Sequence, residues 1–236
     1  MGRSSGFTFK QFHIDHDRCA MKVGTDGILL GAWAPVADAR RVLDIGTGSG
    51  LIALMLAQRS CADCRIVALE LDEAAAAQAA ENVAISPWSQ RIDVQQGALQ
   101  QWQDAPYDLI VSNPPYFRHG QRLPSQTRQQ ARHTATLSHQ ELLQHALRLL
   151  APHGHLALVL PVAEGQAFIP MAAQMRLYLQ HGQQLTPKPG KEVNRFLLLF
   201  GRESIGEIWG ELMICAENGD YTEAYAGMVS PFYLKL

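Results

Sequence analysis

The sequence predicts an α/β fold: a doubly wound, mostly parallel sheet of seven strands with an antiparallel hairpin at one edge. Three observations support this. Short apolar runs alternate along the chain with longer helical patterns, which is typical of parallel strands joined by crossover helices. The first run enters a glycine-rich turn at residues 46–50. The last two runs are joined by a short link rich in Pro and Gly, as expected for a hairpin.

The elements follow in order. Residues 41–45 (RVLDI) form the first strand, and residues 51–58 have a helical pattern after the glycines. Residues 65–69 form the next strand, and residues 72–84 are alanine-rich with acids in the first turn, which suits a helix N-terminus. Ser138 and Glu141 match a capping box at the start of another helix. Further strands are expected at residues 92–96, 107–112, 155–160, 177–185 and 196–200, and further helices at residues 138–150 and 164–175.

The N-terminal stretch is expected to pack against this sheet. Residues 7–14 alternate between apolar and polar like a hairpin strand, and Thr25 or Asp26 could cap the helix that follows. We therefore expect an N-terminal extension of residues 1–40 and a catalytic domain of residues 41–236 that ends in a C-terminal strand extension.

Composition allows an ordinary globular enzyme. With 236 residues, of which 47% are hydrophobic and 18% charged, the chain can bury a sizeable core as one α/β domain. The net charge of −2 does not indicate nucleic-acid binding, but the charges are unevenly distributed: residues 118–133 hold four arginines and no acid, whereas residues 203–236 hold six acids. The sequence has neither a secretory signal pattern nor an apolar run long enough to cross a bilayer. We therefore expect a cytoplasmic protein without a membrane partner.

The four cysteines indicate little. Cys61-Ala-Asp-Cys64 is a single CxxC, and no nearby His or Cys completes a zinc site at the spacing of a finger. No metal site is expected. Reduced cysteines in a connecting loop and a redox pair remain the alternatives for this motif.

The glycine-rich turn indicates a nucleotide site. Gly46, Gly48 and Gly50 allow the backbone to turn tightly and approach a ligand, with a helix N-terminus behind them. Asp44 precedes the turn, and Glu70 ends the next strand, where a carboxylate can accept hydrogen bonds from both ribose hydroxyls. A tight loop without a ligand is the alternative. These residues resemble motif I and the acidic-loop residue of class I S-adenosylmethionine-dependent methyltransferases over roughly residues 42–201. The resemblance implies a Rossmann-like class I methyltransferase fold and S-adenosyl-L-methionine as the cofactor.

One position departs from that family. In the family, the strand after the acidic residue ends near the cofactor adenine, often with an acid followed by a small residue. Gly97-Ala98 occupies this place without the acid. If Gly97 and Ala98 contact the cofactor, adenine recognition there would rest on backbone groups.

The tetrapeptide Asn113-Pro114-Pro115-Tyr116 indicates the reaction. It follows the apolar strand of residues 107–112, and two prolines after Asn113 end the strand in a rigid turn. The Asn113 amide and the Pro114 carbonyl offer two acceptors for an NH2 group, and Tyr116 offers a ring for stacking. The stretch resembles the catalytic (Asn/Asp/Ser)-Pro-Pro-aromatic motif of amino-group methyltransferases. A structural double-proline turn is the alternative.

The motif alone leaves the substrate open, because similar motifs serve adenine amines in DNA and RNA, guanine amines in ribosomal RNA and glutamine side chains in release factors. Only forty-three residues precede Asp44, too few for the helical domain that release-factor methyltransferases carry there. No stretch has room for the target-recognition domain of restriction-type DNA adenine methyltransferases. A DNA substrate is therefore not expected.

Pieces from the whole chain narrow the substrate further. Five short stretches closely resemble the bacterial tRNA1(Val) adenine-N6 methyltransferases, which modify the adenine beside the anticodon, at position 37. They are residues 9–12 (FKQF), 22–27 (KVGTDG), 29–33 (LLGAW), 131–133 (ARH) and 230–234 (SPFYL). The resemblance implies transfer of a methyl group to the N6 amine of that adenine. Lys22, Thr25 and Asp26 then become candidates for cofactor contact, with a capped helix against the sheet edge as the alternative.

The basic run after the tetrapeptide fits an RNA substrate, because arginines suit phosphates and stacked bases. A solvated surface loop is the alternative. Two other functions stay open: a protein-glutamine methyltransferase acting on release factors, and a non-catalytic RNA-binding module with this fold. We expect a monomer whose partner is the anticodon stem-loop of tRNA; the candidate RNA-binding residues are Arg118, Arg122, Arg128, Arg132 and Lys10.

Overall fold

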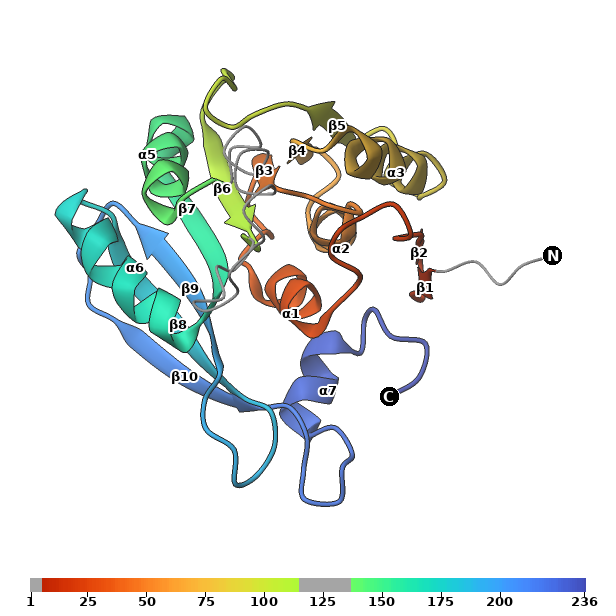
Figure 1. Cartoon of the computed structure of the whole chain (residues 1–236), viewed down its shortest axis with the longest axis vertical. Helices are drawn as coiled ribbons and strands as arrows, with labels where there is room; N and C mark the ends of the chain where they lie inside the picture. Colours follow the sequence, from red (N-terminus) through yellow and green to blue (C-terminus); the bar gives the residue numbers. More distant parts are fainter. Residues whose placement is uncertain (1–5, 115–136) are drawn as a thin grey trace, which may run out of the picture.

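The computed structural model describes residues 6–114 and 137–236, and they form one large sheet with helices on both faces (Figure 1). In chain order the elements are β1 (Phe7–Thr8), β2 (His13–Ile14), α1 (Thr25–Trp33), β3 (Arg41–Ile45), α2 (Leu51–Arg59), β4 (Arg65–Glu70), α3 (Glu73–Ala84), β5 (Ile92–Gln96), β6 (Tyr107–Ser112), α5 (His139–Leu149), β7 (Leu150–Pro161), α6 (Val162–Gln174), β8 (Tyr178–Thr186), β9 (Arg195–Gly201), β10 (Ile208–Met213) and α7 (Glu223–Val229).

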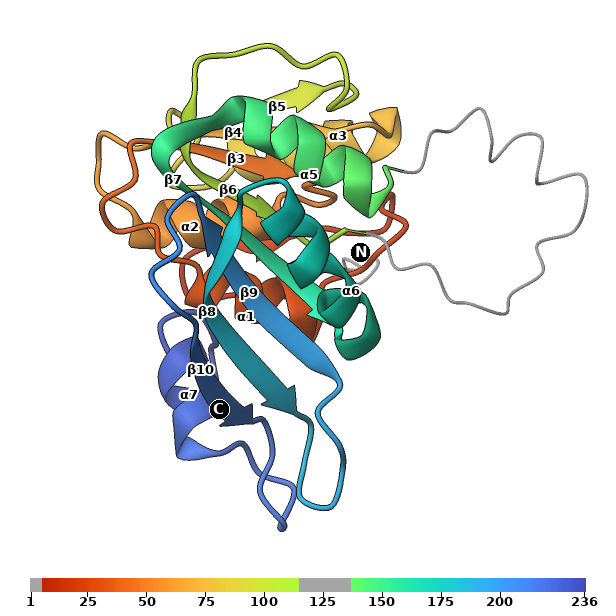
Figure 2. The same ribbon diagram turned by 90° about the vertical axis from the view of Figure 1, so that its left-hand side faces the viewer.

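The large sheet has the order β10-β8-β9-β7-β6-β3-β4-β5. Only β9 runs antiparallel to its neighbours, so the mostly parallel sheet and the β8–β9 hairpin are confirmed. The expected number of seven strands was wrong, because β10 pairs in parallel with β8 and extends the sheet beyond the hairpin, as Figure 2 shows. Only Leu212 of β10 is buried, so its sequence lacks the apolar alternation of a half-buried strand.

Two hydrophobic clusters lie on opposite faces of the sheet. Alternate residues of each strand point to opposite faces, so Val42 of β3 belongs to the cluster with α1, α2 and α7, and Leu43 belongs to the cluster with α5 and α6. The same division separates Leu109 from Ile110 in β6. Both faces of the central strands are therefore covered, as doubly wound sheets require.

The N-termini of the helices show which of the predicted caps form. Ser138 and Glu141 form the capping box at the start of α5, and the Asp72 side chain caps α3 by accepting a hydrogen bond from the Ala75 N–H. The prediction that Thr25 or Asp26 caps α1 was wrong. Gly24 occupies the N-cap position, no side chain caps the helix, and Asp26 lies in the first turn.

Two glycines in α1 allow it to lie close to α2. A Cβ atom at Gly27 would lie 3.1 Å from Leu51 Cδ2, and one at Gly31 would lie 2.9 Å from Met55 Cβ. The two glycines are one helical turn apart and therefore face the same neighbour. This contact seats α1 beside the start of α2, where the glycine turn ends.

The N-terminal hairpin packs against the C-terminal segment. β1 and β2 pair antiparallel, and Phe9, Phe12 and Ile14 are buried. Lys10 joins the two ends of the chain: its backbone N–H donates to the Phe232 carbonyl and its Nζ donates to the Ser230 carbonyl. Figure 1 shows this hairpin beside the segment that follows α7.

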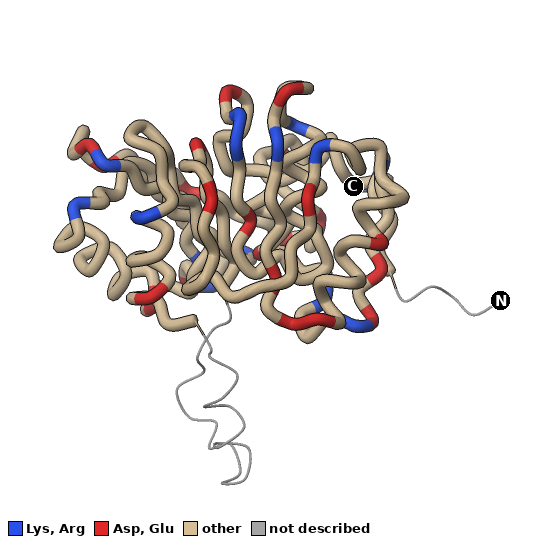
Figure 3. Tube along the Cα trace, turned by 90° about the horizontal axis from the view of Figure 1, so that it is seen from above, with Lys and Arg blue, Asp and Glu red and all other residues tan. Residues whose placement is uncertain are grey.

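Lysines and arginines are interspersed with acids along the described trace (Figure 3). None of its helices is both long and apolar enough to cross a bilayer.

Candidate functional site

Four strands bring the predicted site residues to one edge of the sheet. β3, β4, β5 and β6 are parallel, and their carboxyl ends lead into Gly46, Glu70, Gly97 and Asn113. The register aligns these ends, with Ile45 opposite Ser112 and Glu70 opposite Gln96. Ligands of open α/β sheets bind at this edge.

The turn after β3 depends on its glycines. Gly46, Gly48 and Gly50 have φ values of 70°, 56° and 82°, a left-handed region that favours glycine. A Cβ atom at Gly46 or Gly48 would meet no atom of the described chain within 4 Å. The turn therefore presents bare backbone to open space, where a ligand can approach closely.

Asp44 stabilises the glycine turn through buried hydrogen bonds. It is fully buried, and its Oδ2 accepts hydrogen bonds from Thr47 Oγ1 at 2.6 Å and from the Ala53 N–H at 3.2 Å. Burial raises the pKa of Asp44 to about 7; the two hydrogen bonds oppose the rise, and the nearby Glu70 charge adds to it. Its Oδ1 is buried without a hydrogen-bond partner among the described residues.

Glu70 fixes both the turn and the loop after β4. Its Oε2 accepts from the Gly48 N–H at 2.8 Å, and its Oε1 accepts from the N–H groups of Leu71 and Asp72 at 2.9 and 3.0 Å. The side chain is only partly buried and lines a cavity. A carboxylate offers about four lone-pair sites, so it can accept from a ligand hydroxyl as well.

Two cavities lie on either side of the glycine turn. The smaller, of about 300 Å³, is lined by residues 21–27, residues 46–49, Leu51, Ile52 and Asn113. The larger, of about 620 Å³, is lined by residues 45–46, 69–73 and 96–100, with Ala20, Ser112, Pro114 and Leu137. Gly46 lines both, and so the turn forms the wall between them.

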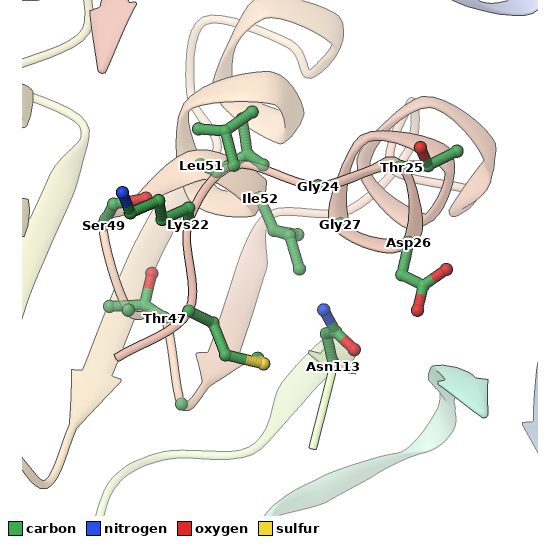
Figure 4. A pocket seen from close by; sticks show the side chains of 14 residues that line it. Lys22, Gly24, Thr25, Asp26, Gly27, Thr47, Ser49, Leu51, Ile52 and Asn113 are labelled. Atoms are coloured by element: carbon green, nitrogen blue, oxygen red, sulfur yellow. The ribbon is translucent and has the colours of Figure 1, made fainter. Parts of the chain in front are cut away.

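Asn113 and Pro114 are consecutive residues, and each lines a different one of the two cavities. Asn113 lines the smaller and Pro114 the larger. The preceding residue, Ser112, is buried and donates to the Ile45 carbonyl at 2.8 Å, which ties the end of β6 to the end of β3. Figure 4 shows the Asn113 amide across the smaller cavity from the glycine turn.

The start of α1 forms the remaining wall of the smaller cavity, which Lys22, Thr25 and Asp26 line. Figure 4 shows the Asp26 carboxylate on the same side as Asn113, away from Thr47 and Ser49. Asp26 accepts from Arg195 Nε at 2.9 Å, and both side chains are about one-quarter exposed. Arg195 comes from the start of β9, 169 residues further along the chain, so sequence reasoning had no local signal for it.

Comparison with known proteins shows the family of this chain. The model of the methyltransferase small domain matches residues 23–187. A tRNA1(Val) (adenine(37)-N6)-methyltransferase from Aeromonas hydrophila is 57% identical over 236 residues, which is 100% of both chains. The chain belongs to the tRNA1(Val) (adenine(37)-N6)-methyltransferase family. A second relative with that name, from Tolumonas auensis, is 50% identical over 98% of this chain and 97% of its own length.

Solved structures agree on the fold of this family member. The crystal structure of a predicted O-methyltransferase from Agrobacterium tumefaciens matches with a TM-score of 0.69, covering 88% of this chain and 96% of the other at 18% identity. At that identity the likeness bears on the fold alone. It confirms the class I methyltransferase fold that the sequence predicted.

The cofactor is S-adenosyl-L-methionine, and the two cavities fit its two ends. Leu69, Leu71 and Leu99 give the larger cavity apolar walls, and the Glu70 carboxylate lies among them. The smaller cavity offers Lys22, Thr25 and the bare turn to a polar amino-acid end. A Cβ atom at Gly46, which lines both cavities, would meet no atom of the described chain within 4 Å.

The structure separates the predicted site residues into groups. The first group lines the two cavities: Gly46, Gly48, Glu70, Gly97, Ala98, Asn113, Pro114, Lys22, Thr25 and Asp26. Asp44 and Gly50 line neither: Asp44 supports the turn, and a Cβ at Gly50 would lie 3.5 Å from Ala79 Cβ. Lys10 lies at the contact of the two chain ends. The remaining predicted residues lie outside the described part of the chain: Pro115, Tyr116, Arg118, Arg122, Arg128 and Arg132.

Proposed function

We propose that this chain transfers the methyl group of S-adenosyl-L-methionine to the exocyclic N6 amine of adenine 37 in tRNA1(Val). The observation that carries the proposal is full-length similarity to relatives of that name, combined with the placement of Asn113 in the lining of one cavity and of Pro114 in the lining of the other. The similarity supplies the substrate, and the position of the dipeptide supplies the acceptors that the reaction needs.

Asn113 and Pro114 position the amine. The lone pair of an adenine NH2 is delocalised into the ring, so the group is a poor nucleophile. Asn113 Oδ1 and the Pro114 carbonyl accept its two hydrogens, which draws the nitrogen toward a pyramidal geometry and directs the lone pair toward the cofactor. When bound, S-adenosylmethionine supplies an electrophilic methyl group on its sulfonium. Alignment of this kind is the main catalytic effect for an in-line displacement.

The nitrogen loses a proton after the transfer, so no strong base is required. In this proposal Glu70 holds the ribose, Gly97 and Ala98 lie along the adenine, and Lys22 and Thr25 hold the amino-acid end. Asp26, through its pair with Arg195, shapes the side of the cavity that faces the substrate amine.

The segment after Pro114 is assigned to RNA. Pro115 belongs to the catalytic tetrapeptide, Tyr116 is assigned to stacking on the displaced adenine, and Arg118, Arg122, Arg128 and Arg132 to the phosphates of the anticodon loop. Lys10 is also assigned to a phosphate of the RNA. Its Nζ already donates to the Ser230 carbonyl, but an ammonium has three donors and can still reach a phosphate.

The organisation of the chain is part of the proposal. Residues 1–40 are an N-terminal extension packed on a catalytic domain of residues 41–236, and the protein acts as a monomer in the cytoplasm. Because residues 21–27 line the smaller cavity, the extension contributes to the cofactor site.

One experiment tests the reaction. The protein is incubated with methyl-labelled S-adenosylmethionine and either unmodified tRNA1(Val) or a release factor, and the digested products are identified. We expect label in N6-methyladenosine at position 37. Label in methylglutamine would replace the proposal with a protein substrate. Cofactor binding without transfer to either substrate would indicate a non-catalytic module.

A further inference from the structure

Helix α3 carries two buried amides that face the N-terminal segment. Gln78 and Asn82 are each 1% exposed and lie one helical turn apart, so they project from one face. The rest of α3 is mostly alanine, which forms helices better than Asn does. Helix formation alone therefore does not account for the amides.

Each amide binds the backbone of the segment of residues 15–19, and Gln78 also binds the side chains of Asp17 and Cys19. Asn82 Oδ1 accepts from the Asp15 N–H at 3.0 Å, and Asn82 Nδ2 donates to the Asp15 carbonyl at 2.8 Å. Gln78 Oε1 accepts from the Arg18 N–H at 3.0 Å and from Cys19 Sγ at 3.2 Å. Together they hold an irregular segment that has no strand partner at these positions in the described chain.

Asn82 also reaches the glycine turn. Its Nδ2 donates to the Ser49 carbonyl at 2.9 Å, and this contact is buried. Ser49 lines the smaller cavity, and the segment that begins at Asp15 continues into residues 21–27, which line the same cavity. One side chain thus holds together two stretches of chain that form separate walls of the cofactor site.

We propose that Asn82, assisted by Gln78, is a positioning residue for the cofactor: it holds the N-terminal segment against the glycine turn and thereby sets the width of the cavity that takes the amino-acid end of S-adenosylmethionine. The inference rests on the proposed function for the identity of the reaction. It does not depend on the tRNA, because its readout is cofactor binding.

The main test compares full-length Asn82→Leu with the unaltered chain. Leucine has a similar size but makes no hydrogen bond, and it leaves the buried Ser49 carbonyl and the partly buried backbone groups of Asp15 without this partner. Isothermal titration with S-adenosylmethionine should show the Kd raised about ten- to a hundredfold, as expected when buried hydrogen bonds are lost. The KM for the cofactor should rise in parallel, while kcat at saturating cofactor stays within about threefold.

Glu81→Gln is the matched control. Glu81 also lies on α3 and pairs with Arg18 of the same segment, but this ion pair is exposed. Exposed pairs contribute little, so the cofactor Kd should stay within about twofold.

A second measurement follows the segment itself. It contains trypsin sites after Arg18 and Lys22. Asn82→Leu should speed cleavage there, and S-adenosylmethionine should slow it in the unaltered chain.

The proposal is overturned if Asn82→Leu is folded by circular dichroism and binds the cofactor normally, or if only its melting temperature falls. If that variant does not fold, Gln78→Met decides: it removes the contacts to Asp17, Arg18 and Cys19 without touching the turn, and an unchanged Kd would reject the proposal. A protein that binds the cofactor but methylates no tRNA would contradict the proposed function. The cofactor Kd values of the variants would still show whether Asn82 positions the cofactor site.

Discussion

Asp44 links the cofactor turn to the stability of the fold. Its carboxyl is fully buried at the end of β3, and burial raises its pKa to about 7 from the ordinary 3.8. In the unfolded chain the group ionises near its ordinary pKa. Between these two values the folded state binds the proton more tightly, so folding is favoured at low pH and this contribution is lost as the pH rises through about 7.

The size of the effect follows from the shift. About three pKa units correspond to ~4 kcal/mol between the two limits, at about 1.36 kcal/mol per unit. Most of this falls within an accessible range: from pH 5 to pH 8, ionisation of Asp44 should lower the free energy of unfolding by ~2.5 kcal/mol.

Asp44→Asn removes this titration. Its amide oxygen can still accept from Thr47 and Ala53, and its NH2 replaces Oδ1, which has no partner among the described residues. The buried NH2 then costs about 1–3 kcal/mol at every pH. The variant should therefore be less stable than the unaltered chain at pH 5. Between pH 5 and pH 8 the difference in the free energy of unfolding between the two proteins should shift by about 2.5 kcal/mol in favour of the variant.

Urea unfolding of both proteins at half-unit steps from pH 5 to pH 8 measures the gap directly. Groups that titrate in both proteins, such as His139, whose pKa is lowered by burial, cancel in the difference. A gap that stays constant within about 0.5 kcal/mol over this range would refute the assigned pKa and the reasoning from burial.

Other variants test other parts of the site. Asn113→Ala should lower methyl transfer to tRNA by about a hundred- to a thousandfold, because one oriented partner of the amine is lost, and titration should show the cofactor Kd nearly unchanged. Glu70→Gln should raise the cofactor Kd by about tenfold or more, because an amide replaces the carboxylate that binds the turn and faces the ribose; an unchanged Kd would contradict that placement. Gly31→Val should lower the free energy of unfolding by about 1–3 kcal/mol in urea titrations, since its Cβ would lie 2.9 Å from Met55; equal stability would show that α1 and α2 can separate at no cost.

The central sheet could be predicted because its signals are local. β3, β5 and β6 have the expected bounds: β3 and β6 are short apolar runs that end at Gly46 and Asn113, and β5 alternates Ile92 and Val94 with polar residues before Gly97. The capping box of Ser138 and Glu141 is equally local, because both partners lie within one helical turn.

The missed features depend on contacts between distant segments. β10 buries one side chain, and its place is set by pairing with β8, for which the sequence carries no pattern. Asp26 suits a helix cap by residue type, yet its carboxylate binds Arg195, 169 residues away. In the same way, Gln78 and Asn82 look like polar positions of an exposed helix face, and only the fold shows that they are buried against the N-terminal segment.

This difference explains why the fold class alone indicated one side of the site, whereas Lys22, Thr25 and Asp26 on the other side were indicated only by the resemblance to the family. The glycine turn, Glu70 and Asn113-Pro114 lie at the ends of parallel strands, a place that the fold class alone assigns to a ligand. The facing wall is an irregular stretch, residues 21–27, whose position depends on hydrogen bonds from α3 to residues that precede it. Strand ends can fix the reacting groups, but an irregular wall needs a separate anchor before it can hold a ligand tightly. Affinity for the cofactor should thus respond to α3 as strongly as to the motif residues, whereas the rate of the chemical step should respond mainly to Asn113.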